Sequence, residues 1–129
     1  MKMTSKLLIS LACVAMLAGC ARTAPILTPQ TTIMTKNSLP TVKKAILEVG
    51  QKRKWVMNDV SPGIIDGLLK NRSHDVKIRI TYTDKNYTIH YVSSQNLKAH
   101  DGNIHRNYNR WINSLDNDIQ LRLAAMANQ

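Results

Sequence analysis

The sequence is poor in acidic groups and lacks phenylalanine. Its 129 residues include eight Asp and Glu against 18 Lys and Arg, a formal net charge of +10. Because Glu48 is the sole glutamate, no pair of carboxylates for glycoside hydrolysis can be assigned. The core has to be built from Ile, Leu, Val, Trp and Tyr. The excess of cations favours anionic partners such as lipid headgroups, acidic glycans or nucleic acid.

Cysteine is scarce as well. The chain has two cysteines, and Cys13 lies inside an apolar run near the N-terminus. If that run is removed, Cys20 remains alone, which excludes an intramolecular disulfide. The histidines do not show the tight spacing of a zinc site, so we expect neither a metal nor a cofactor. They are His74, His90, His100 and His105.

The N-terminal apolar run is too short to span a bilayer. It holds about ten mostly apolar residues, Leu7 to Met16, whereas a membrane-spanning helix needs about 20. Lys2 and Lys6 precede it, and the small-residue stretch Leu17-Ala18-Gly19 follows it. This three-part pattern predicts a secretory signal peptide over residues 1–19.

The segment Leu17-Ala18-Gly19-Cys20 resembles the lipobox of bacterial lipoproteins at all four positions. The resemblance implies cleavage before Cys20, a diacyl group on its sulfur and frequent acylation of the new amino terminus. Two or more fatty chains hold a protein stably, at about 0.8 kcal/mol per buried methylene. Ala21, by similarity to lipoproteins of Gram-negative bacteria, favours the periplasmic side of the outer membrane over the inner membrane. An ordinary signal peptide with a chance cysteine, or a short buried helix, is the alternative.

The composition after Cys20 indicates a flexible tether. From Ala21 to Pro40 the residues are mostly Thr, Pro, Ser, Asn and Gln, which bury little apolar surface. We expect a lipidated tether over residues 20–40 and one domain over residues 41–129. About 20 flexible residues would hold that domain on the order of 25 Å from the bilayer.

Apolar residues at helical spacing predict two helices. One extends over about residues 41–53, and the other over about residues 104–126 with Asn103 as N-cap. Between them, alternating patterns predict four strands with one apolar and one polar face. These strands are Trp55–Val60, Ile64–Asn71, Val76–Tyr82 and Tyr87–Tyr91.

The predicted fold class is therefore α+β. A four-stranded antiparallel meander carries both helices on its apolar face, in the order α-β-β-β-β-α. Alternatively, the second strand is a short helix and the sheet has three strands.

The polar face of the predicted sheet is one candidate anion-binding surface. Lys77, Arg79 and His90 lie outward on neighbouring strands, where Lys70 or Arg72 could join them. Such a face could hold an acidic glycan, a phospholipid headgroup or an acidic peptide. The alternative is ordinary solubilising charge.

The start of the last helix is a second candidate, because Arg106 and Arg110 accompany free helix N–H groups there. The helical wheel places both arginines opposite the apolar stripe, which favours a solvated surface instead. Nucleic acid is not expected, because the tyrosines that could stack on bases are assigned to the core. They are Tyr82, Tyr87 and Tyr91.

No catalytic residue is assigned, since no serine lies in a nucleophile-elbow context. The junction formed by His100, Asp101 and His105 is a candidate for a hydrolase of envelope polymers, although exposed or capping roles are the simpler interpretation. We therefore expect a protein that is not an enzyme.

Residues Trp55 to Ile119 resemble a family of small uncharacterised Gram-negative envelope lipoproteins. The matching features are the SPG turn at 61–63, the alternation in VKIRITY and YTIHY, and the segment IHRNYNRWINSL. The family brings no established activity. The expected function is a lipid-anchored module that binds an envelope protein or an anionic cell-wall or lipid component.

Overall fold

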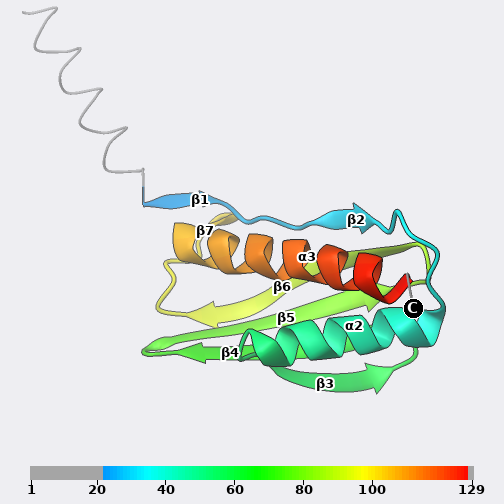
Figure 1. Cartoon of the computed structure of the whole chain (residues 1–129). Coiled ribbons are helices and arrows are strands. Elements are labelled where there is room, and N and C mark those ends of the chain that lie inside the picture. The colour runs from blue at the N-terminus through cyan, green and yellow to red at the C-terminus, as the bar shows by residue number, and fades with distance from the viewer. Residues whose placement is uncertain (1–21, 128–129) are drawn as a thin grey trace, which may run out of the picture.

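The computed structural model describes residues 22–127, which form an α+β domain with two helices, a five-stranded antiparallel sheet and a separate two-stranded sheet (Figure 1). The elements in chain order are β1 (Thr23–Pro25), β2 (Gln30–Thr32), α2 (Leu39–Lys52), β3 (Val56–Ser61), β4 (Ile64–Asn71), β5 (His74–Tyr82), β6 (Asn86–Gln95), β7 (Asn103–His105) and α3 (Arg106–Ala127).

The main sheet has the strand order β2-β6-β5-β4-β3, and all its neighbours are antiparallel. The four predicted strands are present as β3 to β6, joined by consecutive turns, so the α+β prediction is confirmed. The second of them is strand β4, and its alternative interpretation as a helix is wrong. The four-strand count is also wrong, because β2 adds a fifth strand from the segment that was predicted to be a tether.

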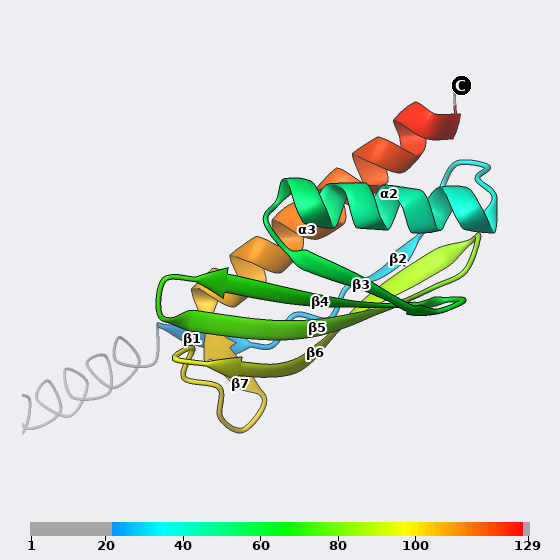
Figure 2. The ribbon, with the colours of Figure 1, turned by 90° about the horizontal axis from the view of Figure 1, so that it is seen from below.

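Strand alternation sorts the side chains of the main sheet into two faces. In β5, Val76, Ile78, Ile80 and Tyr82 are buried. Both helices cover this apolar face, and neither of them lies on the opposite face (Figure 2). A register shift between Lys77 and Ile78 gives β6 one extra residue there, which is the geometry of a β-bulge.

Helix α2 begins after Ser38, whose hydroxyl accepts a hydrogen bond from the Thr41 N–H at 3.3 Å. Its buried side includes Gly50, a residue that normally weakens a helix. A side chain at Gly50 would collide with the Met57 side chain on β3. The glycine therefore allows the helix to lie close to the edge of the sheet.

Helix α3 begins two residues later than predicted. Residues Asn103–His105 form β7, which pairs with β1, so Asn103 is not the N-cap. Instead, the His105 ring accepts a hydrogen bond from the Asn107 N–H at Nδ1 (3.1 Å). The predicted apolar stripe does face the core, where five α3 residues are buried: Tyr108, Ile112, Leu115, Ile119 and Leu123.

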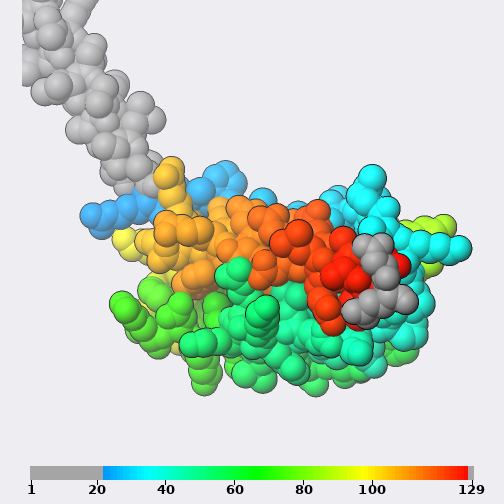
Figure 3. Space-filling view, viewed as in Figure 1, coloured from blue at the N-terminus to red at the C-terminus, as the bar shows by residue number. Residues whose placement is uncertain are grey.

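The N-terminal segment (residues 22–38) is the main correction to the sequence prediction. It lies along α3 in Figures 1 and 3 instead of forming a flexible tether. Asn109 of α3 binds its backbone twice, because Oδ1 accepts from the Leu27 N–H (3.0 Å) and Nδ2 donates to the Pro25 carbonyl (2.9 Å). Farther along, Asn37 Nδ2 donates to the Leu123 carbonyl (3.1 Å).

The centre of this segment is held by a shared carboxylate. The Thr31 hydroxyl donates to Asp116 Oδ1 at 2.7 Å, and the Tyr87 hydroxyl donates to the same oxygen at 2.5 Å. Burial raises the pKa of Tyr87, and the bond to Asp116 raises it further, so this phenol remains a donor. One carboxylate thus joins β2, β6 and α3.

Because the Thr31 hydroxyl helps to hold the N-terminal segment on the domain, removing it weakens the fold. We expect Thr31→Val to lower the free energy of unfolding by about 1.5–3 kcal/mol, the usual contribution of a hydrogen bond to a charged group. Urea denaturation measures the change. Thr28→Val, at an exposed position of the same segment, is the control and should stay within about 0.5 kcal/mol. An unchanged stability for Thr31→Val would indicate a tether.

Candidate functional site

The candidate site is the face of the main sheet opposite α2 and α3, which we call the open face. A groove of about 520 Å³ crosses it. The groove is lined by Val56, Asn58, Asp66, Gly67, Leu68, Lys77, Ile78, Arg79 and Val92.

Cross-strand pairing builds the groove as two adjacent rows. In the first row, Val56 lies opposite Leu68, and Leu68 lies opposite Lys77. Val92 adds a further apolar side chain beside Lys77, at the bulge in β6. Val56 and Val92 are 68% and 54% exposed, so this row presents apolar surface to solvent.

The second row is polar and internally paired. Arg79 lies opposite Asp66 on one side and His90 on the other. Its guanidinium donates to both oxygens of Asp66, from Nε (2.7 Å) and from an Nη atom (3.1 Å). The hydrogen bond from Arg79 lowers the pKa of the Asp66 carboxyl, so the pair stays ionised near neutral pH.

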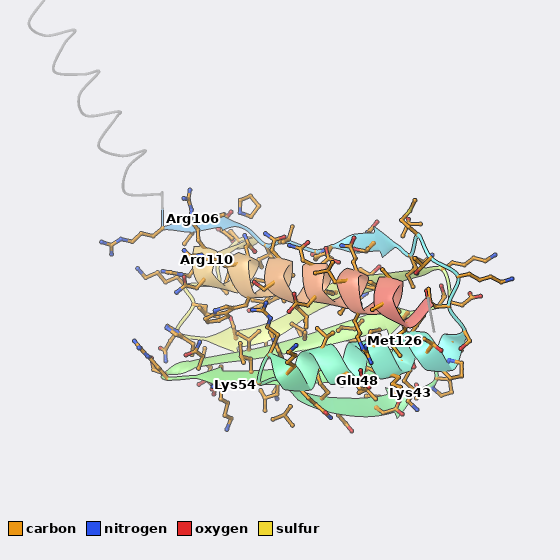
Figure 4. The ribbon with its side chains drawn as sticks, in the orientation of Figure 1. Lys43, Glu48, Lys54, Arg106, Arg110 and Met126 are labelled. Atoms are coloured by element: carbon orange, nitrogen blue, oxygen red, sulfur yellow. The ribbon has the colours of Figure 1, made fainter. Side chains whose placement is uncertain are left out.

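Of the other residues predicted to bind an anion, Lys77 and His90 lie on the open face and the two α3 arginines do not. His90 Nε2 lies 3.0 Å from the Thr81 hydroxyl and shares a hydrogen bond with it. Lys77 forms no ion pair within residues 22–127. Arg106 and Arg110 lie on α3, in the helical layer, and do not join the open face (Figure 4).

The structure therefore brings Lys77, Arg79 and His90 onto one face, but with a counter-ion that the sequence reasoning missed. Asp66 neutralises Arg79, and the exposed apolar residues between the cations make the groove amphipathic. The sequence of β4 contained a sign of this. Asp66 and Leu68 alternate with the buried residues of the strand, so both side chains belong to the face away from the core.

The junction at residues 100–105 forms no enclosed site. His100 Nε2 lies 3.0 Å from a carboxylate oxygen of Asp101, and their side chains are 85% and 82% exposed. His105 is occupied by its capping hydrogen bond. His100, Asp101 and His105 do not line the groove on the open face.

Within residues 22–127, no cluster of three His, Cys, Asp or Glu side chains is arranged to hold a metal ion. In the same range, no helix is long and apolar enough to cross a membrane. The predicted signal peptide and Cys20 lie outside the described residues. No family model matches the chain, and comparisons with curated proteins and with solved structures found no match.

The pairing of Arg79 predicts the effect of removing its counter-ion. We expect Asp66→Asn to bind a sulfated polyanion about fivefold more tightly, since one uncompensated charge near an anionic surface contributes about 1 kcal/mol. Stability should change by less than about 1 kcal/mol, because the pair is solvent-exposed. Salt elution from a polyanion column measures the difference.

Asp84→Asn makes the same charge change in the exposed turn between β5 and β6 and serves as the matched control. Equal retention of the two variants would show that net charge, not release of Arg79, governs binding.

Proposed function

We propose that this protein is a lipid-anchored envelope protein whose domain binds a protein partner on its open face. The observation that carries the proposal is the amphipathic groove on the face of the sheet opposite both helices. Exposed apolar surface framed by polar groups is typical of interaction sites.

A protein partner accounts for this surface better than an anionic glycan does. Val56, Leu68 and Val92 offer aliphatic contact, which a polyanionic sugar chain does not need. Arg79 is already paired with Asp66, which leaves Lys77 as the cation within the groove that has no ion pair among the described residues. The complementary partner surface carries aliphatic side chains and an acidic group facing Lys77.

Anchoring through Cys20 is supported by the lipobox resemblance of residues 17–20. The described chain begins at Arg22, and Thr23 is already paired with His105. An acyl group at Cys20 would thus lie only three residues before the first strand. The domain would then sit close to the membrane surface.

Acylation is tested by radiolabelled palmitate in a Gram-negative host. The wild-type chain should incorporate label, and Cys20→Ala should lose it completely, because the thiol is the acceptor. Cys13→Ala, within the leader, is the control and should retain label. Incorporation that survives Cys20→Ala would contradict the anchor.

Partner binding is tested by photocrosslinking in living cells. A photoreactive residue at position 56 or 92 should give a discrete crosslinked protein, whereas one at Leu121, which is 70% exposed on α3, should not. Leu68→Asp places a charge inside the groove and should reduce the crosslink at least about tenfold. A band that persists in Leu68→Asp, or that also forms from position 121, would contradict binding on the open face.

A further inference from the structure

A second cavity lies at one end of the domain, away from the groove. It has a volume of about 370 Å³ and lies where the C-terminal end of α2, the β4–β5 hairpin and the first half of α3 meet. It is lined by Arg53, Lys54, Trp55, Leu69, Lys70, Asn71, Arg72, Trp111 and Ser114.

The lining of this cavity is strongly cationic. Arg53 is paired with Asp118 on α3, with Nε 2.6 Å from the carboxylate. Among residues 22–127, Lys54, Lys70 and Arg72 form no ion pair, although Asp75 lies opposite Lys70 in the strand register. Lys54, Lys70 and Arg72 thus border one hollow, and none of them has a carboxylate partner among the described residues.

The dipole of α2 explains only part of this charge. Cations near a helix C-terminus are favourable, which accounts for Arg53 and Lys54. Lys70 and Arg72 belong to the β4–β5 hairpin, where no helix end requires them. An anion in the cavity would face the cations from both elements.

Two of these cations occupy backbone positions suited to glycine. Lys54 has φ 69° and Arg72 has φ 59°, both in the left-handed region that side chains disfavour. Glycine or asparagine would fit the backbone at both positions better, yet both positions carry a cationic side chain.

The cavity also has an apolar wall. Trp55 and Leu69 are buried beneath it, and Trp111 is half-buried in its lining. Tryptophan combines an apolar ring with an N–H donor and is enriched where proteins meet the headgroup layer of a membrane.

The cavity lies at the end of the molecule where the described chain begins. Figures 1 and 2 both place the β4–β5 hairpin and the start of β1 at the same end. Figure 4 labels Lys54 beside the C-terminal end of α2, and Arg106 and Arg110 at the start of α3, where the described chain begins. Figure 3 shows the start of the chain and the start of α3 side by side at this end.

We propose that this cationic end faces the membrane and that the cavity binds the phosphate of an anionic lipid headgroup. The inference rests on the proposed anchoring, since acylated Cys20 would hold this end against the bilayer. Arg72 offers a planar fork to phosphate oxygens, and Lys54 and Lys70 offer point charges. Trp111 contacts the headgroup layer beside them.

The test uses the chain from Ala21 onward, without the leader and without Cys20. All the core residues lie between Val42 and Leu123, so this chain keeps the entire core, and circular dichroism checks each variant. Binding is measured by cosedimentation with vesicles of phosphatidylglycerol and phosphatidylcholine, and with phosphatidylcholine vesicles as reference. The fluorescence of Trp55 and Trp111, which both line the cavity, reports its occupancy.

The decisive variant is Lys54→Gly combined with Arg72→Gly, because glycine suits both left-handed positions and preserves the fold. We expect its affinity for phosphatidylglycerol vesicles to fall about thirtyfold at low salt. The matched control is Lys36→Gly combined with Lys85→Gly, two exposed lysines in loops at the opposite end, and it should lose less than about threefold.

Three results would overturn the proposal. Equal losses in the two double variants would mean that diffuse charge, not the cavity, attracts the membrane. Unchanged affinity in the Lys54→Gly, Arg72→Gly variant would remove the cavity from binding. Fluorescence titration with glycerol 3-phosphate but no vesicle binding would assign the site to a soluble phosphate. Because this chain carries no acyl group, these results are independent of the palmitate and crosslinking tests.

Discussion

The arrangement of the domain depends on the carboxylate of Asp116, which accepts hydrogen bonds from Thr31 and Tyr87 at once. These bonds connect three elements that are far apart in the sequence. Asn109 and the Leu123 carbonyl make further contacts to the N-terminal segment at positions seven residues before and after Asp116. Because seven residues are close to two helical turns, all three contacts lie on one side of α3. These contacts hold the N-terminal segment along α3. The described chain therefore begins at the same end of the domain as α3.

That constraint separates the two candidate surfaces. The open face lies on the side of the sheet opposite both helices, where its apolar row remains accessible. The cationic cavity lies at the end of the domain where the described chain begins. If the domain is held to the membrane at this end, the groove on the open face stays accessible to a partner. Anchoring and partner binding would then use different surfaces of one small domain.

Local periodicity was sufficient to predict the α+β class, the four strands β3 to β6 and the buried stripe of α3. It failed for the N-terminal segment, because the partners of Leu27 and Thr31 lie more than 80 residues away and composition alone suggested a tether. It also placed Lys77, Arg79 and His90 on one face but missed Asp66, since strand pairing sets that neighbour. The cavity was not predicted, because it requires α2, α3 and a hairpin to meet.

Amide hydrogen exchange tests the docked N-terminal segment most directly. The Ile26 N–H donates to the Gly102 carbonyl at 2.9 Å, and the Ile33 N–H donates to the Lys85 carbonyl at 2.8 Å. Both amides should exchange many times more slowly than amides of an unstructured peptide, and close to the rates of other short edge strands. Exchange of both at the unprotected rate, while the Ile80 amide in the central strand stays protected, would contradict the account.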